Sequence, residues 1–262
     1  AGEYRIERSL GVVEIIDYLV AGRAEAHRFV IPEGLTLEQV TNLLVDQRLG
    51  TRERFVRAMH RRPARYGLNL RVGRDNLEGY LMPDTYRFAS GLTEREIVEA
   101  LVQNWKRKVW TPNEKAFQAS ERSVDEIVVM ASLIEREARV PEDRPRIASV
   151  INNRLEQSML LQIDATVLYA LGKHKSRVTF NDLKVKSPYN TYRRKGLPPG
   201  PICSPGLASI QAVLTPDITD YYYYVAQPDG RHVFTRTAGE HGAAIARLQK
   251  AARNTHAAPT GR

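Results

Sequence analysis

The chain has 262 residues, of which 42% are hydrophobic, and its formal net charge is +9. This length allows one large domain or two modest ones, and the composition is that of an ordinary globular protein with a real core. The single cysteine, Cys203, excludes an internal disulfide framework and a metal cluster built on several cysteines. The positive charge favours an anionic partner such as nucleic acid, phospholipid or an acidic cell-wall polymer.

The start of the chain indicates a fragment. No run approaches the roughly 20 apolar residues that a membrane-spanning helix needs, and no signal peptide is visible. The sequence opens with Ala1 and Gly2 rather than methionine, and residues 4–6 already have the pattern of a strand. We expect that a preceding segment was removed.

The first sixty residues alternate strand and helix patterns. Strands are predicted at 4–6 and 28–31, and amphipathic helices at 12–21, 36–47 and 52–59. Thr36 and Gln39 have the spacing of a capping box. These patterns predict a small α/β module.

Residues 76–88 read as an irregular loop, because Gly79 and Pro83 interrupt regular structure. The loop carries three aromatic side chains, Tyr80, Tyr86 and Phe88. Flat rings of this kind stack on sugars or bases, and they equally pack a loop onto its own domain. Helices are predicted next at 94–107 and 112–120.

A helix predicted to begin at Ser123 is apolar on nearly every face. Ser123 and Glu126 form a second capping-box pattern, and residues 127–134 are apolar except for Ser132. Pro141 requires the helix to end before it. Such a helix belongs in the interior of a domain.

Glu135 lies near the end of this helix. Desolvation and the negative end of the helix dipole both oppose ionisation there, which predicts a raised pKa and suits a general acid. The alternative is an ion pair with Arg136 or Arg139 that only ends the helix. Glu137 lies about 200° round the helix from Glu135, so the two cannot act as a facing pair.

The second half of the chain mixes helices with stiff loops. Helices are predicted from about 142 to 157 and from Asp164, as N-cap, to 171. Ser204 and Pro205 fit the N-cap and first position of a helix running to 214. A β-hairpin is predicted within 220–235, followed by a helix that opens at Thr237. His232 and His241 could be metal ligands, but no second pair at metal-ligand spacing supports them, so no metal site is predicted.

Six segments in order resemble the MltG (YceG-like) endolytic murein transglycosylase family. They are EGYLMPDTYRF at 78–88, ASLIEREA at 131–138, INNRL at 151–155, LQIDATVLYALG at 161–172, SPYNTY at 187–192 and GLPPGPICSPG at 196–206. Each segment is weakly specific by itself, but their order over nearly the whole chain is specific.

The resemblance implies an α+β fold. It implies a small LysM-like α/β module at 1–65, truncated at its start, a helix-rich YceG-like catalytic domain with a β-hairpin near its C-terminus at 66–255, and a disordered tail at 256–262. It also implies an enzyme of the cell envelope, anchored in the inner membrane through a missing N-terminal helix, with its catalytic part outside the membrane. The implied partners are peptidoglycan strands and cell-wall synthases, with no cofactor.

The resemblance implies that Glu135 is the catalytic acid and base. It further implies that three motifs line the glycan groove and supply these substrate contacts: Glu78, Tyr80, Gln162, Asp164, Thr166, Tyr189, Asn190 and Tyr192. The expected reaction is cleavage of the β-1,4 bond between N-acetylmuramic acid and N-acetylglucosamine, with formation of a 1,6-anhydro end. One carboxyl group suffices for it, because the muramoyl 6-hydroxyl replaces water as nucleophile.

Three other functions compete with this one. A muramidase-type hydrolase needs a second carboxylate roughly 5–9.5 Å away, and Asp164 or Glu137 are the nearby candidates, although Glu137 points away from Glu135. A non-catalytic peptidoglycan-binding protein would explain the basic charge but not the buried acid. Nucleic-acid binding rests on charge alone, without a motif.

Overall fold

The computed structural model describes residues 11–20, 26–60, 66–67, 75–172, 175 and 178–257. The chain divides into two compact units. Unit 1 comprises residues 1–114 together with 203–206, and unit 2 comprises residues 115–202 and 207–262. The predicted strand at 4–6 and residues 258–262 of the predicted tail lie outside the described residues.

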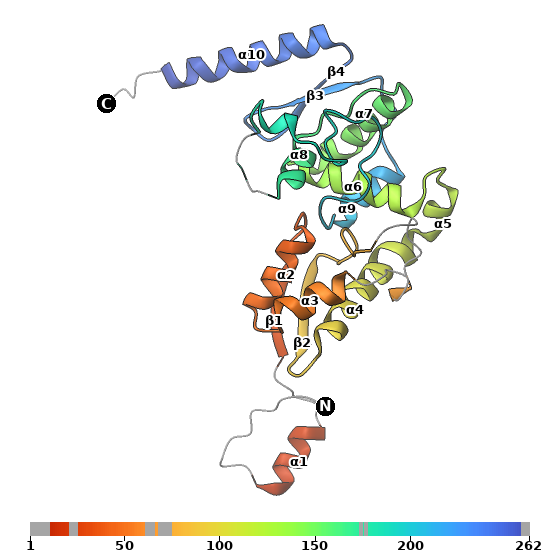
Figure 1. Cartoon of the computed structure of the whole chain (residues 1–262), viewed down its shortest axis with the longest axis vertical. Helices are drawn as coiled ribbons and strands as arrows, with labels where there is room; N and C mark the ends of the chain where they lie inside the picture. Colours follow the sequence, from red (N-terminus) through yellow and green to blue (C-terminus); the bar gives the residue numbers. More distant parts are fainter. Residues whose placement is uncertain are drawn as a thin grey trace. The chain divides into compact units, whose positions relative to one another are not determined.

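Unit 1 joins a two-stranded sheet to several helices (Figure 1). Its described helices and strands are α1 Val12–Val20, β1 Ala26–Ile31, α2 Leu37–Asp46, α3 Arg52–Met59, β2 Asp84–Ala89 and α4 Glu94–Trp105, which continues as a π-helical turn, Lys106–Trp110. Helix α3 packs between α2 and α4. The predicted helices at 12–21, 36–47, 52–59 and 94–107 are therefore confirmed, apart from small shifts at their ends.

The sheet of unit 1 pairs two strands that are distant in the sequence. β1 and β2 are antiparallel, with Phe29 opposite Tyr86 and Ile31 opposite Asp84. The predicted strand at 28–31 is confirmed. The interpretation of all of 76–88 as a loop is wrong, because its second half is β2; Tyr86 and Phe88 are buried and pack against Phe29, which accounts for their aromatic character.

The peptide segment 203–206 completes unit 1. The Ser204 amide donates to the Leu35 carbonyl at 2.8 Å, and the Gly34 amide donates to the Ser204 carbonyl at 2.9 Å. The expected cap at Ser204 is wrong, because the following helix, α9, begins only at Leu207. Ser204 is instead held by these two backbone hydrogen bonds to Leu35 and Gly34.

Unit 2 is built around α6, Val124–Glu137, which packs against α7, α8 and α9 (Figure 1). The other elements in its part of the chain are η3 Pro141–Asp143, α7 Arg144–Glu156, α8 Asp164–Leu171, η4 Asp182–Lys184, α9 Leu207–Leu214, β3 Tyr223–Ala226, β4 His232–Thr235 and α10 Ala238–Ala257. Helix α5, Thr111–Ala119, runs across the boundary in sequence. The predicted hairpin is confirmed, with β3 and β4 antiparallel and α10 packed against both.

Helix α6 has the expected start, burial and end. Ser123 Oγ accepts from the Glu126 amide, and the Glu126 carboxylate accepts from the Ser123 amide, which completes a capping box. Residues 127–134 are all buried. The helix ends at Glu137, with Ala138 in an extended conformation. The central helix and the α+β class are therefore confirmed.

Asp164 was expected to cap a helix, and residues 65 and 66 were expected to separate two domains. Asp164 is the first residue of α8 rather than its cap, because Ile163 occupies the cap position. The predicted domain boundary between residues 65 and 66 falls inside unit 1. The division into a LysM-like module and a catalytic domain stays a prediction, as does the disordered tail; within it, residues 256 and 257 belong to α10.

Candidate functional site

The last turn of α6 presents two carboxylates to different neighbours. Glu135 accepts a hydrogen bond from Ser209 Oγ at 2.7 Å, and its other oxygen lies 3.8 Å from Arg144 Nη2. Arg144 Nε also donates to Ser209 Oγ at 3.2 Å, which closes a ring of three side chains. The side chain of Glu135 is only 8% exposed. This ring holds α6 against α7 and α9. It corresponds to the ion pair expected as the structural alternative for Glu135, but the partner is Arg144 rather than Arg136 or Arg139.

Glu137 has a different environment. Tyr224 Oη, from β3, donates to Glu137 Oε2 at 3.1 Å. Burial raises the pKa of Glu137 to about 7, and the negative charge of Asp164 contributes to the rise, while the Tyr224 hydrogen bond opposes it. The residue still keeps part of its surface exposed. Glu137 is thus a half-buried glutamate whose carboxyl group titrates near neutrality.

The partner phenol remains a hydrogen-bond donor. Burial and the adjacent Glu137 carboxylate raise the pKa of Tyr224 well above its ordinary value of 10. Because Tyr224 holds Oε2, the proton of neutral Glu137 belongs on Oε1. The geometry therefore directs the acidic proton away from the tyrosine.

Asp164 and Tyr192 form a second pair within electrostatic range of Glu137. Tyr192 Oη donates to Asp164 Oδ1 at 2.6 Å. Burial, the Asp164 bond and the Glu137 charge all raise the pKa of Tyr192. Two of the predicted contact residues thus lie near a carboxyl group at the end of α6. The carboxyl group that they influence is Glu137.

Arg154, in the predicted motif at 151–155, joins the segments around this cluster. Its guanidinium donates to the carbonyls of Leu160, Leu161 and Tyr222 at 3.0, 2.8 and 2.6 Å. It also lies 5.0 Å from the ring centroid of Tyr223. Burial lowers the pKa of Arg154, yet the guanidinium stays charged at neutral pH. Arg154 fixes the chain that carries Tyr224 and the chain that leads into α8.

Gln162 and Tyr189 lie on the accessible side of this region. Gln162 is exposed with a φ of 54°, an unusual conformation for a residue other than glycine. Its Oε1 is 3.5 Å from Arg154 Nη1. Tyr189 is partly exposed and packs its ring against Tyr169, with 4.8 Å between centroids. Both residues thus keep part of their surface exposed.

Thr166 and Asn190 are fully buried. Thr166 Oγ1 lies 2.9 Å from Thr191 Oγ1, which joins α8 to the 187–192 segment. Asn190 Nδ2 donates to the carbonyls of Leu183 and Val185, each at 2.9 Å. These two side chains support the loop rather than face a ligand.

Glu78 and Tyr80 belong to unit 1 and are also buried. The Glu78 carboxylate accepts from the Leu37 amide at 2.9 and 3.1 Å, which places a negative charge at the first turn of α2. The Tyr80 ring packs on Trp105 with 4.9 Å between centroids. Glu78 and Tyr80 therefore stabilise the interior of unit 1.

Two histidines of the described residues, His232 and His241, have partners of their own. His232 Nδ1 lies 2.8 Å from Asp143 Oδ2, and the same oxygen accepts from the His232 amide. His241 stacks on Tyr223. Across the described part of the chain, no three His, Cys, Asp or Glu side chains come close enough together to hold a metal ion.

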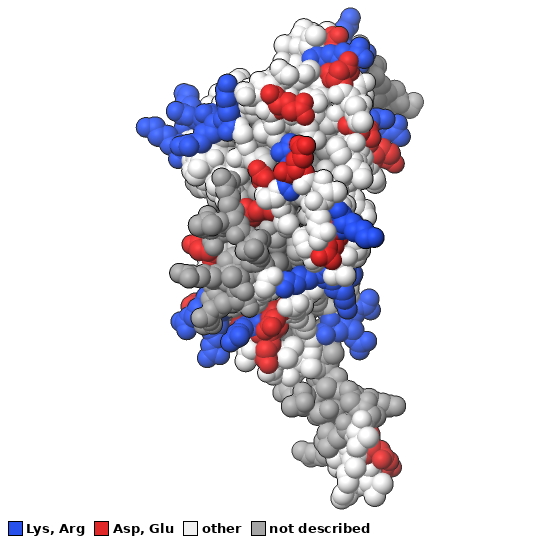
Figure 2. Space-filling model, turned by 90° about the vertical axis from the view of Figure 1, so that its right-hand side faces the viewer, with Lys and Arg blue, Asp and Glu red and all other residues white. Residues whose placement is uncertain are grey.

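The charged side chains on one face of the molecule lie in several separate groups. On the face drawn in Figure 2, small groups of Lys and Arg side chains alternate with acidic and uncharged residues. Within the described residues, no helix is long and apolar enough to cross a bilayer.

The profile of the YceG-like family matches residues 1–247. The chain belongs to the YceG-like family. The endolytic murein transglycosylase of Bacillus subtilis strain 168 is 38% identical over 258 residues, covering 93% of this chain and 71% of that protein. The enzyme of the same name from Streptococcus pneumoniae strain D39 is 28% identical, and the match spans 94% of this chain but half of that protein.

A solved structure of a YceG-like protein from Listeria monocytogenes is similar to this chain, with a TM-score of 0.76 and 34% sequence identity. The match covers 92% of this chain and 83% of the Listeria chain. The resemblance predicted from the six motifs is thereby confirmed at the level of the family and of the fold. That the first module is LysM-like stays a prediction.

Sequence reasoning missed Tyr224 and Arg154 and set Glu137 aside. Tyr224 lies within a run of four tyrosines, 221–224, and nothing local distinguishes it from its neighbours. Arg154 was inside a recognised motif, so an arginine in an otherwise buried helix face was an available signal. Glu137 was judged only by its direction relative to Glu135.

Proposed function

We propose that this YceG-like chain is a peptidoglycan lytic transglycosylase and that Glu137 is its general acid and base. The observation that supports this most is the carboxyl group of half-buried Glu137, which has a pKa of about 7 and accepts a hydrogen bond from Tyr224. A carboxyl group whose pKa lies near the working pH can donate a proton as an acid and accept one as a base. The names of the Bacillus and Streptococcus relatives supply the substrate class.

In the proposed reaction, protonated Glu137 delivers its Oε1 proton to the oxygen that bridges N-acetylmuramic acid and N-acetylglucosamine. The C1–O bond breaks, the electron pair goes to the leaving oxygen, and positive charge develops at the muramoyl C1 as in an oxocarbenium ion. The carboxylate then accepts the proton of the muramoyl 6-hydroxyl. The O6–C1 bond forms, so the product carries a 1,6-anhydro end and no water is consumed.

The surrounding residues have supporting parts in this reaction. Tyr224 keeps Oε2 occupied and fixes the orientation of the acid. Asp164, held by Tyr192, provides a negative charge that stabilises the developing positive charge. Gln162 and Tyr189 are proposed contacts for the glycan, and the four buried candidates Glu78, Tyr80, Thr166 and Asn190 act by holding their loops.

Glu135 is the residue that the sequence favoured as acid. We assign it a structural part because Ser209 and Arg144 already occupy its two oxygens. The two assignments make opposite predictions for two variants of similar size and polarity. Glu137→Gln removes the acid in the present proposal, whereas Glu135→Gln weakens only the packing of α6 against α7 and α9.

A muramidase is the one alternative that a specific observation favours. Asp164 lies close enough to Glu137 to raise its pKa, and a hydrolase uses a second carboxylate to activate water or to attack the sugar. The two reactions leave different ends on the product. A reducing end identifies hydrolysis, and an anhydro end identifies the transglycosylase.

The proposed site of action is the cell envelope, where peptidoglycan lies. An inner-membrane anchor in a preceding segment and an association with cell-wall synthases are proposals that rest on the family resemblance. The net charge of +9 suits a protein that works beside anionic wall polymers.

The test is mass spectrometry of purified glycan strands after incubation with the parent protein and with Glu137→Gln. Anhydro-muramoyl ends made by the parent and absent with the variant support the proposal. Reducing ends made by the parent support the muramidase. If the folded parent leaves the strands intact, the proposed activity is refuted for this chain.

A further inference from the structure

A cavity of about 620 Å³ opens on unit 2 beside the β3–β4 hairpin. Its lining includes Arg146 on α7, Asp217 and Ile218 on the segment before β3, and the aromatic side chains of Tyr221 and Phe234. All of these residues belong to the same unit. None of them was singled out by the sequence.

The cavity presents one cation and one anion next to an aromatic wall. Arg146 Nε lies 3.6 Å from Asp217 Oδ2, and the two side chains are 50% and 46% exposed. Such a loose, half-exposed pair contributes little to stability, so both groups remain able to bind a ligand. The Arg146 guanidinium also lies 6.0 Å from the ring centroid of Phe234. The site therefore suits a ligand that carries both signs of charge.

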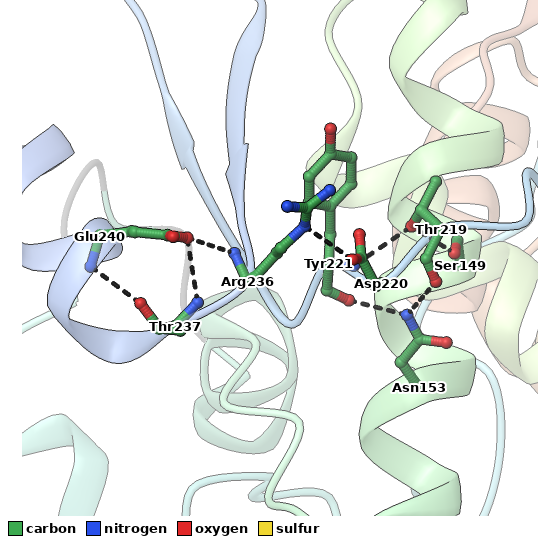
Figure 3. Close-up of polar contacts among 8 residues, drawn as sticks. All are labelled: Ser149, Asn153, Thr219, Asp220, Tyr221, Arg236, Thr237 and Glu240. Carbon is green, nitrogen blue, oxygen red and sulfur yellow. Dashed lines mark hydrogen bonds and ion pairs between the residues drawn. The ribbon is translucent and has the colours of Figure 1, made fainter.

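The segment that forms one side of the cavity is irregular but firmly held. Figure 3 shows Asn153 Nδ2 donating to the carbonyls of Thr219 and Tyr221, at 2.8 and 2.9 Å. In the same view Ser149 Oγ lies 2.7 Å from Thr219 Oγ1. A segment fixed in this way pays little ordering entropy when a ligand binds.

Ile218 stands out within this fixed segment. Its side chain is fully exposed although both neighbouring positions are anchored, Asp217 through its amide to the Pro145 carbonyl and Thr219 through Ser149 and Asn153. The fold gains nothing from an isoleucine that contacts no core. An apolar contact with a ligand is a use for it.

Two aromatic rings, Phe234 and Tyr224, connect the cavity to the proposed acid. The ring centroid of Phe234 is 6.2 Å from that of Tyr224, whose hydroxyl donates to Glu137. Tyr221, which also lines the cavity, packs against Phe234 with 5.8 Å between ring centroids. The cavity and the proposed acid are thus joined by a short series of side-chain contacts within unit 2.

We propose that the cavity binds the peptide stem of the muramoyl residue that is being cleaved. The inference rests on the proposed function, because it takes a peptidoglycan strand as the ligand at Glu137. A stem peptide carries carboxylates, the amino group of its diamino acid and the methyl groups of its alanines. Arg146 binds a carboxylate, Asp217 binds the ammonium group, and Ile218 contacts the methyl groups.

Cleavage rates on two substrates test the proposal. One substrate is glycan strands with intact stems, and the other is the same strands after an amidase has removed the stems. The parent is expected to cleave intact strands about tenfold more efficiently, which corresponds to about 1.4 kcal/mol of binding. Arg146→Ala is expected to lose that preference through a higher KM with kcat unchanged. Arg146→Ala acting on intact strands with the parental KM would overturn the inference.

Arg236→Ala is the matched control. Arg236 is an exposed arginine of the same region that pairs with Asp220, and it does not line the cavity. It should keep the parental preference for intact strands. A loss equal to that of Arg146→Ala would show that overall positive charge, rather than the cavity, recognises the substrate, and this result also overturns the inference.

Direct binding separates this inference from the proposed activity. Calorimetric titration of a soluble stem tripeptide needs no turnover, so it gives a result even if the parent cleaves nothing. Binding to the parent that Arg146→Ala weakens about tenfold supports the cavity. No binding to the parent, or equal binding to both proteins, overturns it.

Discussion

Replacing Glu137 by glutamine should make the protein more stable at alkaline pH while removing its activity. The pKa of Glu137 is raised from an ordinary 4.5 to about 7, so the folded state binds this proton more tightly than the unfolded chain does. The resulting stability is fully present below the unfolded pKa and is lost as pH rises through the folded one. Above that point the parent carries a desolvated charge that glutamine lacks.

The size of the effect follows from the shift. At about 1.4 kcal/mol per pKa unit, the rise corresponds to about 3 kcal/mol in the free energy of unfolding. Glu137 is partly exposed, and solvent screening reduces the expected gain to about 2 kcal/mol. Glu137→Gln should therefore unfold at a higher temperature than the parent at about pH 8.5, and the gain should disappear at about pH 4.

The assay is thermal unfolding followed by circular dichroism at both pH values. Glu135→Gln, two residues away on the same helix, is the control. It removes the negative partner of Arg144 and should lower the free energy of unfolding by roughly 1–3 kcal/mol. If Glu137→Gln is no more stable than the parent at about pH 8.5, the argument from desolvation is refuted.

Three further variants test individual contacts. Tyr224→Phe removes the hydrogen bond that lowers the pKa of Glu137, so the alkaline limb of the pH–rate profile should move to higher pH while kcat falls; an unmoved limb would contradict this. Lysine in Arg154→Lys cannot reproduce the guanidinium hydrogen bonds to three carbonyls, so this variant should lower the free energy of unfolding in urea by roughly 3 kcal/mol. Little change in that free energy would show that the hydrogen bonds are dispensable. Glu78→Ala removes the acceptor of the Leu37 amide and should lower the free energy of unfolding by about 1 kcal/mol in the same assay. An unchanged free energy of unfolding would show that Glu78 does not stabilise the start of α2.

Local sequence patterns predicted those elements whose cause is local. The capping boxes at Thr36 and Ser123 need only residues three positions apart, and both form as expected. The hairpin of β3 and β4 follows from the turn residues 228–230, Pro-Asp-Gly, between two runs rich in strand-forming residues. The strand β2 was missed because its partner, β1, lies more than fifty residues earlier, and its loop-breaking neighbours Gly79 and Pro83 dominated the pattern.

The candidate site was predictable to within one turn of helix. Burial of α6 and the position of Pro141 directed attention to the carboxylates at its end. The choice between them depends on residues far away in sequence: Ser209 lies 74 positions after Glu135, and Tyr224 lies 87 positions after Glu137. A helical projection gives the direction of each side chain, but it does not give the chemistry of what faces it.

The central claim is that Glu137 is the proton donor and acceptor of this YceG-like chain. The most direct measurement compares the rates at which folded Glu137→Gln and Glu135→Gln release anhydro-muramoyl ends from peptidoglycan strands. The account predicts a loss of about 10²–10⁴-fold for Glu137→Gln and a rate within about tenfold of the parent for Glu135→Gln. The reverse order, with Glu135→Gln inactive and Glu137→Gln near the parental rate, would contradict it.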